Sequence, residues 1–200
     1  NSGTFYMYGG SITGNSAGNT NDYTDGGGVY VDNNSTFTLS GSASITGNWT
    51  NGSGGGVYVS GGIFDMKSGS ITGNKADTSG GGVHVGWSGT FHMSGGSITG
   101  NNVKNKNGVN LASGTVTVSG SANITGNVKG GKNSNGIYTG GTANNVGLNV
   151  DSSITIGDGL TGTARIGVAN EPSESNPVKI ATGATGDLSV YKDIFTPDVS

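Results

Sequence analysis

A tetrapeptide that recurs along the chain, Ile-Thr-Gly-Asn, constrains the fold more than any other feature of this sequence. It begins at Ile12, Ile45, Ile71, Ile98 and Ile124, at spacings of 33, 26, 27 and 26 residues. Two other motifs keep a fixed place around it. An apolar pair separated by one residue precedes each Ile by seven or eight positions, and a Gly-Gly-Gly-Val-aromatic-Val segment follows it at Gly26–Val31, Gly54–Val59 and Gly80–Val85. Units of about 26 residues are too short to bury an apolar face alone, so they must stack on one another.

Each apolar segment alternates with a period of two residues, which indicates β-strands. Three strands per unit, each paired in parallel with its copy about 4.8 Å away, would coil the chain around a filled interior. We therefore predict an all-β fold, a right-handed parallel β-helix with three sides and about six to seven coils. The expected core columns are Phe5, Phe37, Phe64, Phe91 and Val116; Met7, Leu39, Met66, Met93 and Val118; Ile12, Ile45, Ile71, Ile98, Ile124 and Ile154; and Val29, Val57, Val83, Val109 and Ile137.

Polar residues between the strands should form the corners. We expect the Gly before each Val to turn the chain at positive φ. The Asn of each tetrapeptide should stack on its copies and hydrogen-bond along the axis. These residues are Asn15, Asn48, Asn74, Asn101 and Asn127.

The repeat pattern divides the chain into two regions of one domain. Residues 1–156 carry the β-helix repeats, and 157–200 are expected to form irregular last coils or a C-terminal cap, with Ile194 and Phe195 as its plug. Because the sequence starts inside a repeat, we expect it to be a fragment of a longer protein.

Composition excludes several classes of function. The chain has 42 Gly among 200 residues, no Cys and a formal net charge of −3. Nine basic residues against twelve acidic ones give no basic footprint for nucleic acid. No apolar run approaches the roughly 20 residues of a membrane span. Two His are too few for a zinc site, and Asp22, Asp25 and Asp32 form only a weak calcium cluster. We expect no metal, no cofactor and a monomer.

The motifs resemble a known class of surface proteins. Gly54-Gly55-Gly56-Val57 and Ile71-Thr72-Gly73-Asn74 stand where the chlamydial polymorphic outer-membrane adhesins have their Gly-Gly-Ala-Ile and Phe-x-x-Asn motifs. Over residues 1–156 the sequence is similar to repetitive cell-surface proteins of Gram-positive gut bacteria, which share the pectate-lyase-like fold. The resemblance implies a secreted or cell-surface bacterial protein, an adhesin or a stalk.

One outward column is rich in aromatic residues. It contains Tyr30, Tyr58, His84, Asn110 and Tyr138, and Trp87 follows His84 closely. Exposed aromatic rings stack on sugars and mark binding surfaces. In the alternative interpretation these rings only cover the strand backbone. We expect contact with a glycan or a host-surface protein at this edge, centred on Tyr58, His84 and Trp87.

Two further outward features leave other functions open. Asp65 and His92 should lie one rung apart near Lys67, a pair able to transfer protons in a polysaccharide lyase or glycoside hydrolase. Repeated Ser-x-Thr pairs around each Ile resemble ice-binding solenoids, and we include Ser153 and Thr155 among them. We favour a non-catalytic adhesin or stalk module, with the enzyme as the alternative and the ice-binding solenoid as the second alternative.

Overall fold

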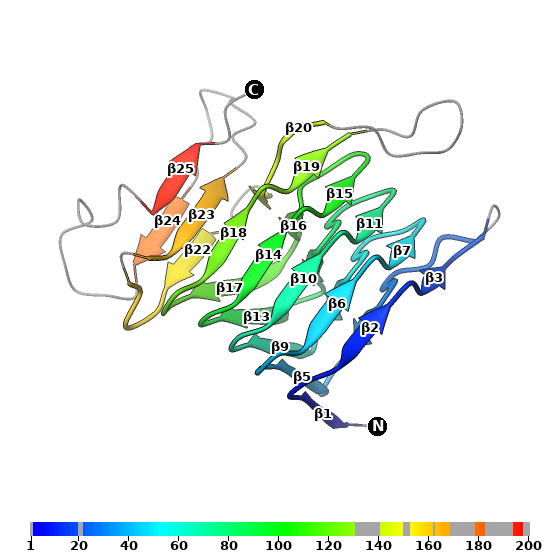
Figure 1. Ribbon diagram of the computed structural model, residues 1–200, viewed down its shortest axis with the longest axis horizontal. Coiled ribbons are helices and arrows are strands. Elements are labelled where there is room, and N and C mark those ends of the chain that lie inside the picture. Colours follow the sequence, from blue (N-terminus) through cyan, green and yellow to red (C-terminus); the bar gives the residue numbers. More distant parts are fainter. Residues whose placement is uncertain are drawn as a thin grey trace.

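The computed structural model describes residues 2–19, 22–130, 141–149, 153–161, 163–168, 179–182 and 194–197, and all regular structure in them is β (Figure 1). The chain winds through four strand positions in each coil. The first face holds β1 (Thr4–Met7), β5 (Thr36–Leu39), β9 (Ile63–Met66), β13 (Gly89–Met93), β17 (Gly114–Val118), β22 (Ser153–Ile156) and β24 (Lys179–Thr182). The second face holds β2 (Ser11–Thr13), β6 (Ser44–Thr46), β10 (Ser70–Thr72), β14 (Ser97–Thr99), β18 (Asn123–Thr125) and β23 (Arg165–Val168), which pairs with β25 (Phe195–Pro197).

The other two positions complete each coil. The third face holds β4 (Val29–Val31), β8 (Val57–Ser60), β12 (Val83–Gly86), β16 (Val109–Leu111) and β21 (Val146–Leu148). Between the second and third faces lies a corner of two-residue strands, β3 (Ser16–Ala17), β7 (Trp49–Thr50), β11 (Lys75–Ala76), β15 (Asn102–Val103), β19 (Val128–Lys129) and β20 (Thr142–Ala143). The parallel β-helix prediction is confirmed, with a short fourth strand that the sequence pattern did not indicate.

Pairing follows the repeat residue by residue. Ile45 lies opposite Ile71, and Ile71 opposite Ile98, so each strand contacts its own copy one coil away. The named strands pair in parallel, except that β19 and β20 are antiparallel. At the C-terminal end β23 pairs with β18 of the second face and with β21 of the third, so it joins two faces.

The core consists of columns of identical or similar residues. Phe64 and Phe91 are fully buried and stacked with ring centroids 5.0 Å apart. Phe5 begins the same column and stacks on Phe37 at 5.6 Å, but it is 54% exposed, so the prediction that it is buried is wrong. Among the described residues of the first coil, no aromatic ring covers the other face of Phe5. At the other end Ile194 is buried in the core and Phe195 packs against it, as expected of a plug.

The positions predicted from the repeat pattern are wrong for the residues that follow a long insertion. Val109 pairs with Val146, 37 residues later rather than 26, because the chain between β19 and β20 is longer than in other coils. Ile154 consequently pairs with Val116 in the Phe column, not with Ile124 as predicted, and Ile166 takes the place opposite Ile124. Ser153 and Thr155 move to the first face with it. Ile137 lies outside the described residues.

The predicted ladder of Asn side chains exists at the corner after the second face. Asn74 is fully buried; its Nδ2 donates to Oδ1 of Asn101 at 3.0 Å and to the carbonyl of Ile45 at 2.9 Å. Its Oδ1 accepts from the backbone N–H and from Nδ2 of Asn48, at 3.0 and 2.9 Å. The ladder runs through Asn15, Asn48, Asn74, Asn101 and Asn127 and continues to Asn145. The Asn side chain of each coil therefore hydrogen-bonds the backbone of the turn in the preceding coil.

The Gly-Gly-Gly corner needs glycine for two different reasons. The first glycine has positive φ, 72° at Gly54 and 62° at Gly80, a conformation that favours glycine. The glycine before Val does not, contrary to our expectation. A Cβ on Gly56 would lie 2.6 Å from the carbonyl oxygen of Gly82, so close stacking of successive coils excludes a side chain there.

None of the described segments forms a helix long and apolar enough to cross a membrane.

Candidate functional site

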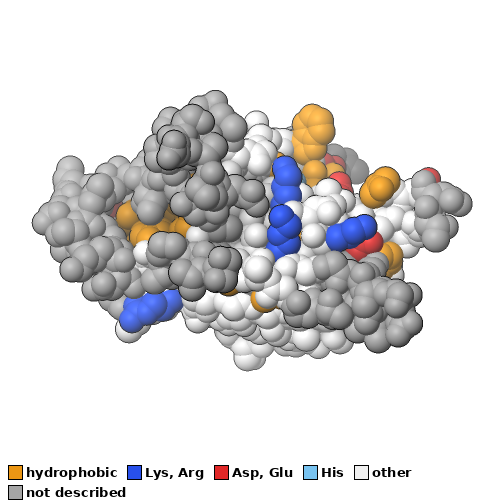
Figure 2. Space-filling view, turned by 90° about the horizontal axis from the view of Figure 1, so that it is seen from above, with side chains coloured by type: hydrophobic (Ala, Val, Ile, Leu, Met, Phe, Trp, Pro, Cys, Tyr) orange, Lys and Arg blue, Asp and Glu red, His pale blue; other side chains and the backbone are white. Residues whose placement is uncertain are grey.

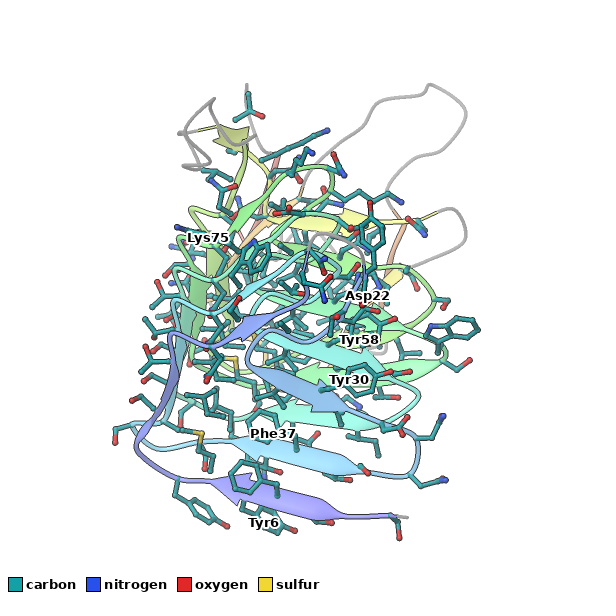
Figure 3. The ribbon with its side chains drawn as sticks, turned by 90° about the vertical axis from the view of Figure 1, so that its right-hand side faces the viewer. Tyr6, Asp22, Tyr30, Phe37, Tyr58 and Lys75 are labelled. Carbon is teal, nitrogen blue, oxygen red and sulfur yellow. The ribbon has the colours of Figure 1, made fainter. Side chains whose placement is uncertain are left out.

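The outward column of the third face is a continuous stack of rings. Tyr30 and Tyr58 lie 5.2 Å apart, and Tyr58 and His84 lie 5.0 Å apart, with interplanar angles of 11° and 12°. Figure 3 shows Tyr30 and Tyr58 on neighbouring strands of this face. Asn110 continues the column, since His84 pairs with it in register. The place after Asn110 is taken by Gly147, and Tyr138 lies outside the described residues.

Most of this stack is not exposed. Tyr30, at the end, is 51% exposed, but Tyr58 and His84 are only 5% and 7% exposed, so the expectation of an open aromatic stripe is wrong for those two. Their ring faces contact each other, and the residues around them close the rest. Within the stack only Tyr30, at its end, is substantially open to solvent.

Trp87 lies at the corner that follows β12 and is 73% exposed. Its φ is 51°, and that of the next residue, Ser88, is 61°, so two non-glycine residues in succession adopt the left-handed region. The Trp87 backbone N–H donates to Oγ of Ser113 at 3.0 Å. The corner thus holds a large apolar ring out into solvent.

Three polar or aromatic groups meet beside Gly86. A Cβ on Gly86 would lie 3.3 Å from Nε2 of His84 and 3.5 Å from the hydroxyl oxygen of Tyr58. The indole N–H of Trp87, its only donor, also acts on the pKa of Tyr58 and lowers it. Sequence spacing predicted that Trp87 and His84 lie close, and the structure adds the hydroxyl of Tyr58 to this group.

Hydrogen bonding fixes the tautomer of His84. Nδ2 of Asn107 donates to Oδ1 of Asn110 at 3.3 Å, which turns Nδ2 of Asn110 toward Nδ1 of His84, also at 3.3 Å. Nδ1 accepts, so the proton of the neutral ring is on Nε2, beside Gly86. An imidazole N–H and a phenol hydroxyl therefore lie side by side next to Gly86.

Burial keeps both groups neutral near pH 7. Burial, assisted by the charge of Lys106, lowers the pKa of His84 to about 4. Burial raises the pKa of Tyr58, and the carboxylate of Asp25 raises it further, although the hydrogen bond from Trp87 acts against them. Neutral donors and acceptors suit the hydroxyl groups of a sugar.

Charge is distributed unevenly around this site. Lys104 and Lys106 lie on the exposed loop between β15 and β16, whereas Asp22 and Asp25 lie on the loop between β3 and β4. Figure 2, viewed from the side where the two-residue strands lie, shows basic side chains at the middle of that surface and acidic ones toward the N-terminal coils. The motif analysis did not single out the two lysines, although their position beside a glycine corner was visible in the sequence.

The predicted Asp65–His92 pair forms on the first face. Oδ1 of Asp65 and Nδ1 of His92 are 2.9 Å apart on strands β9 and β13. Both side chains are accessible, at 29% and 50%. Thr38 precedes Asp65 in this column but is 3% exposed, and Lys67 is exposed nearby along the chain. Within the described ranges no three His, Asp or Glu side chains gather as a metal site would need.

Comparison with family models, with curated proteins and with solved structures returns no match to this chain.

Proposed function

We propose that this chain is a non-catalytic module of a secreted or cell-surface bacterial protein, which binds glycan as an adhesin at the edge formed by Trp87, Tyr58 and His84. The observation that carries the proposal is the exposed, strained Trp87 beside two neutral polar groups. A host-surface protein is the other ligand of this class.

The backbone at Trp87 adopts a conformation that is unfavourable for a non-glycine residue. The corresponding corner of the preceding coil has Gly61, whose φ of 71° carries no penalty for a glycine. A non-glycine residue in this region costs about 1 kcal/mol or more. Trp87 makes this corner less stable than a glycine would, while its ring stays largely in water. Strain of this kind is typical of functional sites.

The groups at this corner match the two kinds of surface on a sugar ring. A pyranose ring has an apolar face and a rim of hydroxyl groups. The indole of Trp87 supplies a flat surface for the apolar face. Nε2–H of His84 and the hydroxyl of Tyr58 supply hydrogen bonds for the rim. Both side chains belong to the buried ring stack, so they are held in place before a ligand arrives, which lowers the entropy cost of binding.

A glycan array with the wild-type chain and the Trp87→Gly variant tests the proposal. Glycine fits the positive φ, so the variant should fold and lose binding. Tyr8→Ala is the matched control, because Tyr8 is 68% exposed but lies in the first coil between β1 and β2. Equal binding by wild type and Trp87→Gly would show that the edge is wrong. If the wild-type chain binds neither a glycan nor a host protein, the adhesin proposal is wrong and a stalk remains as the function.

A polysaccharide-degrading enzyme is the second candidate, and the exposed Asp65–His92 contact favours it. Asp65 would hold His92 in the tautomer whose Nε2 accepts a proton. Incubation with pectin, alginate and glycosaminoglycans tests this directly. New reducing or unsaturated ends that disappear in Asp65→Asn would support the enzyme and contradict the non-catalytic proposal.

A further inference from the structure

We propose that the ligand of this edge is an acidic glycan, and that it lies over the coils of β12 and β16, between Trp87 and the pair Lys104 and Lys106. This inference rests on the proposed function and adds the charge of the ligand and its position.

A chain of contacts connects the two ends of the proposed site. Trp87 directly follows Gly86, beside which the Tyr58 hydroxyl and Nε2 of His84 lie, and the ring of Tyr58 stacks on that of His84. His84 accepts from Asn110, which in turn accepts from Asn107. Lys106 precedes Asn107 directly, so an aromatic platform, neutral donors and a cation follow one another along the edge of the third face.

The charge of Lys106 also reaches this site. Burial is the main cause of the low pKa of His84, and the positive charge of Lys106 lowers it further. Lys104 is on the same short loop, and both side chains are exposed. Neither makes a hydrogen bond or an ion pair with another side chain in the part of the chain that the structure describes. Two ammonium groups beside a sugar platform therefore remain available to an anion.

Most carboxylates near the column belong to the first coil, whereas Asp77 lies one coil before Lys104. Asp25 contributes to the high pKa of Tyr58, and its Oδ1 accepts from the backbone N–H of Ser53 at 2.7 Å. Asp22 and Asp32 belong to the same first coil, before and after β4. Asp77, on the loop after β11, accepts from the indole N–H of Trp49 at 3.2 Å. An acidic ligand is repelled from the end at Tyr30 and attracted to the end at Lys106, whereas a neutral glycan has no such preference.

Binding of oligosaccharides in solution tests this inference. The acidic probes are hyaluronan and chondroitin sulfate oligosaccharides, and the neutral ones are chitohexaose and maltohexaose. We expect wild type to bind an acidic probe, and the double variant Lys104→Gln/Lys106→Gln to bind it about tenfold more weakly at low salt. The difference should shrink as salt rises, because the lysines are exposed. Lys67→Gln, which changes an exposed lysine on the first face, should bind as wild type does.

The outcomes separate this inference from the proposed function. If wild type binds the neutral probes as tightly as the acidic ones, and Trp87→Gly abolishes both, the acidic ligand is wrong while the glycan-binding edge stands. Full affinity of the double lysine variant for an acidic probe also overturns the inference. Binding of none of the four probes, and of no other glycan on an array, overturns both. Unchanged thermal unfolding of the double variant shows that its loss of affinity does not reflect loss of the fold.

Discussion

Replacing Asn74 with Ala tests how far the Asn ladder holds successive coils together. The Asn74 side chain makes four hydrogen bonds of 2.9–3.0 Å, to Asn48, Asn101 and the carbonyl of Ile45, and none of its surface is exposed. A typical hydrogen bond contributes about 1 kcal/mol, and a buried group left without a partner costs about 1–3 kcal/mol. Four lost bonds predict that the free energy of unfolding falls by about 4 kcal/mol or more.

Asn15 provides the matched control for this experiment. It stands at the exposed end of the same ladder, and its two hydrogen bonds both go to Oδ1 of Asn48. Asn15→Ala keeps the backbone N–H bond to Oδ1 of Asn48 and removes a single hydrogen bond at the exposed end of the ladder, so we expect a loss within about 1 kcal/mol. Urea unfolding followed by circular dichroism measures both variants. Equal losses would refute the argument, since burial of the ladder would then have no energetic consequence.

Three other predictions follow from the column structure. Phe64→Ala should lower the free energy of unfolding by about 3–5 kcal/mol through the cavity it leaves, whereas Phe5→Ala, at a position 54% exposed, should cost clearly less in the same urea titration. His84 has a pKa of about 4 against 6.5 in an unfolded chain, so its neutral form contributes stability that is fully present above pH 6.5 and is lost as the pH falls toward 4. The loss should reach about 3 kcal/mol. The variant His84→Tyr, which repeats Tyr58, should weaken this pH dependence of the melting temperature, and an unchanged profile would contradict the assignment. Trp87→Gly should melt at the wild-type temperature or above it, because glycine relieves the strain at φ 51°; a clear drop would show that the ring stabilises the fold.

Sequence periodicity predicted the first five coils because each repeated residue occupies a repeated environment. Phe64 and Phe91, or Ile71 and Ile98, are buried by the same neighbours, so their spacing alone gives their pairing. Periodicity gave wrong positions where the number of residues between repeats changed. The long connection before β20 displaced Ile154 by one face, and nothing in the tetrapeptide pattern indicates Asn145 as the next residue of the ladder.

The candidate site was predictable in position but not in exposure. Alternation within the strand correctly placed Tyr58 and His84 on the outside of the third face. It could not show that stacking and the adjacent loops would bury them, because loop packing follows no period. The strain at Trp87 was equally invisible, because positive φ is expected at a glycine and this corner closes with a Trp instead. Only the sequence distance between His84 and Trp87 pointed to the corner.

The uniform pairing distance has a consequence for how such a chain folds. Ile45 meets Ile71 after 26 residues and Ile71 meets Ile98 after 27, and insertions lengthen this step, to 33 at Ile12 and to 37 at Val109. Most all-β proteins join distant segments and fold slowly for that reason. Here the loop that must close stays near one coil in length for every added coil, so its entropy cost does not grow with the chain. A protein of this pattern can lengthen by whole coils while its relative contact order falls and its folding proceeds outward from whichever coil forms first.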